Sequence, residues 1–464
     1  MTFAGFTIRR THRLLPLLSI LAISAFLRFF KIKESFSFDF DQEVPAQAAW
    51  EFFKNGKISL IGQELSFQGF FLGPLHNWIQ FIPYGLCNLK PDCVPYFYVI
   101  LGLLTVVLIY LTIKSIFNPR VALISSTIYA ISFTAISYEW GVNSNYFLLL
   151  STLFLLFCLY KYFQQKGLYL VLGGLVSGIA IVNSNPIFIF NALAFFLTSL
   201  LRGNKSWRLY SIFIFALFLN YTPLVIFNFR HDNILWHNFL NFLEQNINHS
   251  NYLLATWPLL SKVTIPFFTY YIFHSTHPLL VFTMLILTIL GSCRILTSKN
   301  KYLIFLVLAP LINYTSLIFY NGHIPEYYFQ QSALAVIIIM AFILSRYKIL
   351  FIIFISIFLW ANINQNIKNE TGINYQVKKQ AVNYIINDTA DQTFNLYRDF
   401  PPGFNTGYNY LFNIYGKYPQ EGGKNLYILV LEPALSLRSK YQETFKNKII
   451  FEKELGPLTI VSIK

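Results

Sequence analysis

The chain has 464 residues, of which 55% are hydrophobic and only 12% carry a charge. A soluble globular protein would have roughly twice that charged fraction, so the composition excludes one. The formal net charge of +15 does not indicate nucleic-acid binding, because no basic run is interleaved with aromatic residues. The composition predicts an α-helical polytopic membrane protein.

Eleven apolar segments are long enough, or nearly so, to cross a bilayer, which takes about 17–25 residues. The first follows Arg9, Arg10 and Arg13 directly, and no small-residue cleavage site comes after it, so we expect it to be retained. The predicted spans are 14–30, 94–117, 121–138, 146–163, 168–183, 186–201, 209–229, 278–297, 302–320, 329–345 and 348–362.

The charges predict the orientation of these spans, because cytoplasmic loops collect Lys and Arg. With the N-terminus inside, the cytoplasmic segments hold fifteen Lys and Arg residues and no acidic residue. All twenty Asp and Glu residues then lie on the extracytoplasmic side. We therefore predict a multi-pass protein, of the plasma membrane if the source is prokaryotic, with its polar chemistry outside.

Three segments predicted to lie outside are large enough to build a site, namely 31–93, 230–277 and 363–464. Residues 1–362 would form a transmembrane domain and 363–464 a small extracytoplasmic α/β domain. In the latter we predict a helix over 376–386 and strands over 393–397, 426–431, 449–454 and 458–463, the last two joined as a hairpin around Gly456 and Pro457.

The first external segment holds the densest acidic cluster before the tail, Asp39, Asp41 and Glu43. A carboxylate close to the membrane face could act as a general base or coordinate a cation. The alternative is a solvated acidic loop. Residues 45–54 read as a helix, and residues 70–86, which are apolar but broken by Gly and Pro, as a helix lying in the interface.

The four cysteines predict no metal site, because no Cys/His cluster has zinc-ligand spacing. Cys158 and Cys293 fall within spans and read as packing residues. Cys87 and Cys93 flank a short external segment, where a disulfide and two free thiols both remain open.

The chain resembles the GT-C superfamily of membrane glycosyltransferases, in particular the protein O-mannosyltransferases and the aminoarabinose transferase of lipid A. FSFDFDQEVPAQAAWEFFKNGKISLIG followed by FFLGPLHNWIQFIPYGL is similar to the first external loop of that superfamily. LLTVVLIYLTIKSIFNPRVALISSTIYAIS and YEWGVNSNYFLLLSTLFLLF resemble its next spans. The resemblance covers roughly residues 10–345 and implies transfer of a sugar from a polyprenyl-phosphate monosaccharide.

By this resemblance Asp41 stands at the family's catalytic Asp-Glu position, with Gln42 in place of the Glu and Glu43 one residue further on. Asp39 is the rival for the base. The family's Lys-Pro-Pro signature appears here as Leu72-Gly-Pro-Leu, so the lysine that would hold the lipid phosphate is missing. His76 or another cation would have to replace it.

Further polar residues are candidates for substrate binding because they lie outside the spans. Arg230, with His231, could bind a phosphate through its forked donors or serve as an interfacial anchor. His323 and Glu326 share a short loop and are either site residues or structural ones. Glu139 and Asn143 lie in another short loop, which faces the first external loop in this superfamily.

The function expected from these features is transfer of a sugar from a polyprenyl-phosphate donor to a hydroxyl of a lipid, protein or glycan, with inversion. Asp41 would be the base, and Arg230 would balance the leaving phosphate. No motif requires a cofactor, and a divalent cation remains open. Membrane lipids are expected partners, and nucleic acid is not. The alternatives are a lipid or polysaccharide transporter and a non-catalytic membrane scaffold.

Overall fold

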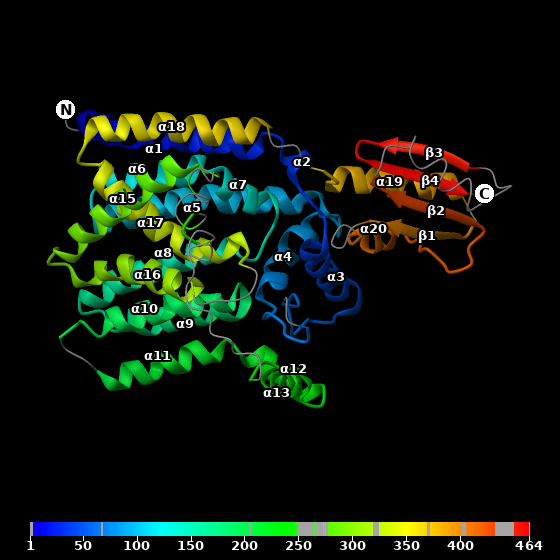
Figure 1. The fold of residues 1–464 in the computed structure, drawn as a ribbon, viewed down its shortest axis with the longest axis horizontal. Coiled ribbons are helices and arrows are strands. Elements are labelled where there is room, and N and C mark those ends of the chain that lie inside the picture. Colours follow the sequence, from blue (N-terminus) through cyan, green and yellow to red (C-terminus); the bar gives the residue numbers. More distant parts are fainter. Residues whose placement is uncertain are drawn as a thin grey trace.

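Apolar helices lie side by side in a bundle, and a small domain with a β-sheet extends from one end of it (Figure 1). The predicted fold class, a helical bundle with a small α/β domain at the C-terminus, is confirmed at this level. The computed structural model describes residues 3–65, 68–203, 206–247, 263–265, 267, 272, 274, 277–318, 324–368, 372–390, 392–400, 405–431 and 450–463.

Local signals start the bundle helices where the sequence predicts them. The Asn118 side chain, for example, accepts hydrogen bonds from the first amides of α6, and Pro119 follows at the first helical position. The bundle helices are α1 (Phe3–Phe29), α5 (Val94–Ile116), α6 (Pro119–Ile131), α7 (Phe133–Trp140), α8 (Tyr146–Phe163), α9 (Leu168–Asn183), α10 (Ile189–Ser199), α11 (Trp207–Leu219), α12 (Thr222–Arg230), α15 (Pro278–Leu296), α16 (Phe305–Ile318), α17 (Gln330–Leu344) and α18 (Lys348–Lys368).

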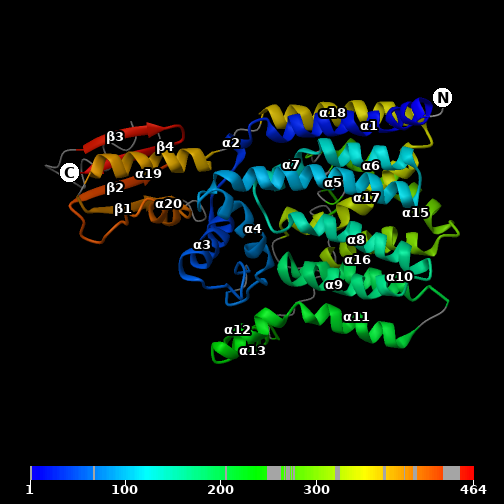
Figure 2. The same ribbon diagram turned by 180° about the vertical axis from the view of Figure 1, so that it is seen from behind.

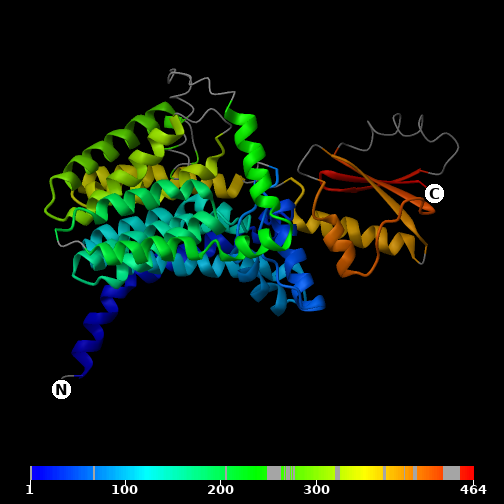
Figure 3. The same ribbon diagram turned by 90° about the horizontal axis from the view of Figure 1, so that it is seen from below.

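Helix α17 forms the centre of the bundle, where it packs against α6, α8, α15 and α16. The N-terminal part of α1 extends beyond the other helices (Figure 3). Short 3-10 turns lead into α10, α16 and α17, namely η2 (Pro186–Phe188), η3 (Lys301–Ile304) and η4 (Glu326–Phe329).

Six helices among the described residues are long and apolar enough to cross a membrane. Two bent pairs, α6 with α7 at 54° and α11 with α12 at 49°, raise the number to eight if each pair is one span. Shorter apolar helices over Leu15–Phe29, Leu168–Asn183 and Pro186–Ser199 occupy the positions of the other three predicted spans. The count of eleven membrane crossings stays a prediction.

The first external segment folds into α2 (Ile32–Ser35), α3 (Phe40–Asn55), α4 (Leu75–Leu86) and η1 (Pro91–Cys93). Helix α3 begins five residues before the predicted helix over 45–54, because Gln42 accepts a hydrogen bond from the backbone of Asp39 at the N-cap. Cys87 and Cys93 form a disulfide. Beyond α12, helix α13 (Ile234–Ile247) packs near residues 69 and 70.

The C-terminal domain confirms the predicted helix and four strands to within a few residues. Its elements are α19 (Tyr375–Thr389), β1 (Phe394–Asp399), α20 (Tyr408–Ile414), β2 (Asn425–Val430), β3 (Ile450–Leu455) and β4 (Leu458–Ile463). The order of these four strands in the sheet is β1-β2-β4-β3. The β1–β2 pair is parallel, and the β2–β4 and β4–β3 pairs are antiparallel. Helices α19 and α20 cover one face of the sheet (Figure 3).

The C-terminal domain shares a hydrophobic core with the first external segment, which lies between it and the bundle (Figure 2). Buried Phe36, Phe38 and Tyr84 belong to the same apolar cluster as Tyr375 and Tyr410. The domain is therefore packed onto the segment that carries the acidic residues.

Candidate active site

A cavity of about 430 Å³ opens where the N-terminus of α3 meets the end of α7 and the start of η4. Four of the residues singled out in the sequence line it together: Asp39, Asp41, Asn143 and Glu326. The other lining residues are Ser37, Phe40, Gln42, Ser137, Tyr138 and Gly141. Polar groups from three distant parts of the chain thus converge on one space.

Asp41 lies in the first turn of α3, and two neutral amides hold its carboxylate. Gln63 donates to one oxygen, and the Asn143 amide lies 3.4 Å from the other. Burial raises the pKa of the Asp41 carboxyl; the Gln63 hydrogen bond opposes this shift, and the neighbouring Asp39 adds to it. A carboxyl with a raised pKa beside a cavity is suited to accept a proton.

Asp39, at the N-cap of α3, is engaged by the C-terminal domain. Its carboxylate lies 2.5 Å from the ammonium of Lys378 in α19. Asp39 and Asp41 therefore differ in surroundings, since the first has a cationic partner and the second has amides.

Glu43 also faces the C-terminal domain. Its two carboxylate oxygens accept hydrogen bonds from the backbone amides of Gly407, at 2.7 Å, and Tyr410, at 3.1 Å. These amides belong to the start of α20, whose free N–H groups favour an anionic partner. Glu43 is not among the residues lining the cavity, and the substrate contact predicted for it would require it to leave this position.

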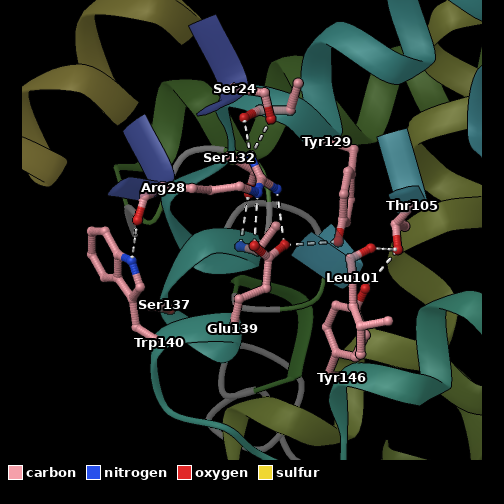
Figure 4. Close-up of polar contacts among 12 residues, drawn as sticks. Ser24, Arg28, Leu101, Thr105, Tyr129, Ser132, Ser137, Glu139, Trp140 and Tyr146 are labelled. Atoms are coloured by element: carbon pink, nitrogen blue, oxygen red, sulfur yellow. Dashed lines mark hydrogen bonds and ion pairs between the residues drawn. The ribbon is translucent and has the colours of Figure 1, made fainter. Parts of the chain in front are cut away.

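Glu139 is the residue whose predicted setting is wrong. It lies within α7 rather than in an external loop, and its side chain is fully buried. Figure 4 shows its carboxylate paired with the guanidinium of Arg28, at 2.7 and 2.9 Å, while Tyr129 donates a third hydrogen bond at 2.9 Å. With its oxygens occupied in this way, Glu139 has a structural environment and not a substrate-facing one.

Arg28 is the partner that sequence reasoning missed. Its side chain is fully buried near the C-terminal end of α1 and also donates to Ser24 and to the carbonyl of Ala130. The indole of Trp140 donates to the Arg28 carbonyl at 2.8 Å. An arginine inside an apolar span is unusual enough to indicate a partner, but it does not identify which one.

Gln42 connects the two sides of the cavity. Its amide donates to the carbonyl of Gly141 at 2.5 Å, so the first turn of α3 is tied to the loop that carries Asn143. The same loop follows Glu139 by two residues. The Arg28–Glu139 pair and the Gln42 contact therefore fix the two segments that meet at Asp41.

His76 is not among the residues that line the cavity beside Asp41. It is buried in α4, with its ring nitrogens 2.7 Å from the Gln80 amide and 3.2 Å from the Tyr98 hydroxyl. Burial lowers the pKa of the imidazole to about 4. A ring that is neutral at pH 7 supplies no positive charge, so a phosphate contact by His76 stays a prediction that would require the ring to gain a proton.

Arg230 and His231 end α12 at the exposed surface, and neither lines the cavity beside Asp41. His231 stacks on Phe227 with ring centroids 4.0 Å apart and donates to its carbonyl. A phosphate contact by Arg230 stays a prediction. His323 lies outside the described residues. Within the described part of the chain, no group of three or more His, Cys, Asp or Glu side chains could hold a metal ion.

The comparisons with known proteins agree with this architecture. The family model of dolichyl-phosphate-mannose-protein mannosyltransferases matches residues 72–226. No curated protein matches the chain.

Solved structures with a similar fold include proteins from a bacterium and an archaeon. ArnT from Cupriavidus metallidurans bound to undecaprenyl phosphate matches with a TM-score of 0.50 at 10% identity, over 96% of this chain and 97% of that one. The oligosaccharyltransferase AglB from Archaeoglobus fulgidus, in complex with an inhibitory peptide and a dolichol-phosphate, matches with a TM-score of 0.52 at 13% identity. That match covers 89% of this chain and 64% of AglB. The resemblance to the GT-C membrane glycosyltransferases is thereby confirmed.

Proposed function

We propose that this protein transfers a sugar from a polyprenyl-phosphate monosaccharide to a hydroxyl group at the extracytoplasmic face of the membrane, with Asp41 as the general base. The acceptor hydroxyl would belong to a lipid, a protein or a glycan. The observation that carries the proposal is the setting of Asp41, a carboxylate held by neutral amides at a polar cavity in a fold shared with ArnT and AglB.

The proposed reaction is a single displacement at the anomeric carbon of the sugar. Asp41 takes the proton of the acceptor hydroxyl, whose oxygen attacks the anomeric carbon. The bond between that carbon and the phosphate oxygen breaks, and the lipid phosphate leaves with its electron pair. Attack opposite the leaving group inverts the configuration. Since the donor is already activated, no nucleotide-binding loop is needed, and a cation near the phosphate would stabilise its charge.

Two further features support Asp41 over Asp39. The Asp39 carboxylate is held in an ion pair, 2.5 Å from the Lys378 ammonium. Asp41 has amides as partners instead of a cation, and burial raises its pKa, which suits it to accept a proton. Glu326 lines the same cavity from η4, and in this proposal it contacts a substrate hydroxyl.

The test compares Asp41→Asn with Asp39→Asn in membranes that contain equal amounts of protein. Release of labelled sugar from a panel of polyprenyl-phosphate monosaccharides measures turnover. Asp41→Asn keeps the shape and removes the basicity, so turnover should fall by about 10²–10⁴-fold. Asp39→Asn should cost less. A larger loss from Asp39→Asn would reverse the assignment, and near-normal turnover in both would exclude this turn of α3 and leave Glu326 to be examined.

A further inference from the structure

Lys378 is a fully buried cation in the C-terminal domain whose three donors all reach polar acceptors around the start of α3. Its ammonium lies 2.9 Å from the carbonyl of Phe38, 2.5 Å from the carboxylate of Asp39 and 2.9 Å from the carbonyl of Thr406. Two of these acceptors belong to the two residues that lead into α3, just before Asp41.

Docking of the domain does not by itself require this buried charge. Phe36, Phe38, Tyr375 and Tyr410 already pack in one apolar cluster across the interface. Desolvation of a buried ammonium is costly, and here burial lowers the pKa of Lys378 while the ion pair with Asp39 opposes that shift. A costly cation placed against the N-cap of α3 therefore indicates a role at that position.

We propose that Lys378 is a positioning residue for Asp41, through which the C-terminal domain fixes the first turn of α3 and balances the charge of Asp39 beside the base. This inference rests on the proposed function, because it assumes that Asp41 accepts the proton. The C-terminal domain would then supply a residue that positions the catalytic base.

The charged and titratable groups around Asp41 determine what the loss of Lys378 would do. Asp39 precedes it on the same helix, Glu326 lines the cavity from η4 and Tyr138 from α7, and Lys378 lies behind Asp39. Without Lys378 the Asp39 charge is no longer balanced, so Asp41 holds its proton to a higher pH. A base works only when it is deprotonated. The acid limb of the pH–activity profile should therefore move to higher pH.

The experiment records the pH dependence of kcat/KM between pH 4 and pH 8 in the full-length protein, with a labelled polyprenyl-phosphate monosaccharide that the wild type turns over. Lys378→Met should shift the acid limb upward by about 0.5–1 pH unit, the size expected for an unbalanced neighbouring carboxylate. The double variant Asp39→Asn with Lys378→Met removes both charges. Its acid limb should lie at the same pH as that of the wild type or at a lower pH.

Lys379→Met is the matched control. Lys379 follows in the same helix and also bridges the two parts of the molecule, with its ammonium 2.7 Å from the carboxylate of Asp92 in η1. None of its hydrogen bonds among the described residues reaches α3. Its loss removes a second, partly exposed ion pair between the same two parts of the molecule and should leave the acid limb at the same pH.

The outcomes separate this inference from the proposed function. If Asp41→Asn retained wild-type turnover, the proposed function itself would be wrong. If Asp41→Asn were inactive but the Lys378→Met limb coincided with that of the wild type or of Lys379→Met, the positioning role would be wrong. If Lys378→Met does not accumulate in membranes, the double variant is measured in its place. An acid limb at higher pH than in the wild type would then overturn the inference.

Discussion

At the scale of single residues, two buried cations stand on either side of the proposed base. Lys378 forms an ion pair with Asp39. Arg28 forms an ion pair with Glu139, just before the loop that carries Asn143. Asp41 could be chosen from the sequence through the family resemblance, and Asn143 and Glu326 because they fall in short loops predicted to lie outside the membrane. Their supports could not, since Arg28 and Glu139 are 111 residues apart and no local pattern connects them.

Gly102 in α5 provides a test of the Arg28–Glu139 pair. A Cβ atom added at Gly102 would collide with the carboxylate of Glu139, so Gly102→Ala should push Glu139 away from Arg28. Breaking a buried ion pair costs about 3–5 kcal/mol, which should lower the midpoint of thermal unfolding in detergent. Gly203→Ala is the control, because an added Cβ there meets nothing within 4 Å. Equal midpoints for the two variants would contradict this account of the pair.

At the scale of elements, most helices and strands were predicted to within a few residues, but α1 begins eleven residues before its predicted span and α18 ends six residues after its own. The start of α3 was wrong by five residues, although the spacing of Asp39 and Gln42 is that of a capping box and could have revealed it. The shift matters because it moves Asp41 from a loop into a helical turn. The docking of α19 and α20 on α3 was not predictable, since residues 39 and 43 meet partners more than 330 positions away.

Gly407 tests the docking of α20 on α3. Its φ of 89° lies in the left-handed region, and an added Cβ would collide with the carbonyl of Phe38. Gly407→Ala should therefore displace α20 from Glu43 and make the C-terminal domain more sensitive to limited proteolysis.

Gly416→Ala is the control for that experiment. Gly416 has a φ of 69° at the end of α20, but an added Cβ there meets nothing within 4 Å. It shares the backbone strain of Gly407→Ala without the collision. If both variants were cleaved at the same rate, strain alone would explain the effect, and the contact with Phe38 would not hold the domain.

At the scale of the whole molecule, the N-terminus and the C-terminal domain lie at opposite ends of the bundle, as the charge distribution leads us to expect (Figure 1). A membrane-impermeant maleimide applied to intact cells should label Lys424→Cys, before β2, and not Lys301→Cys, in η3. The background should carry Cys293→Ser, because Cys293 is exposed whereas Cys158 is buried and Cys87 is bonded to Cys93. Labelling of both positions from the same side would exclude the predicted orientation.

The contact between Lys378 and Asp39 also sets an order of events during synthesis. The two residues are 339 positions apart, and a ribosome adds roughly 5–20 residues per second, so α3 is made on the order of 20–70 s before its buried cation exists. During that interval the first turn of α3 lacks the partner that fixes it. We therefore expect the first turn of α3 to reach its final position only after α19 has been translated and the C-terminal domain has folded.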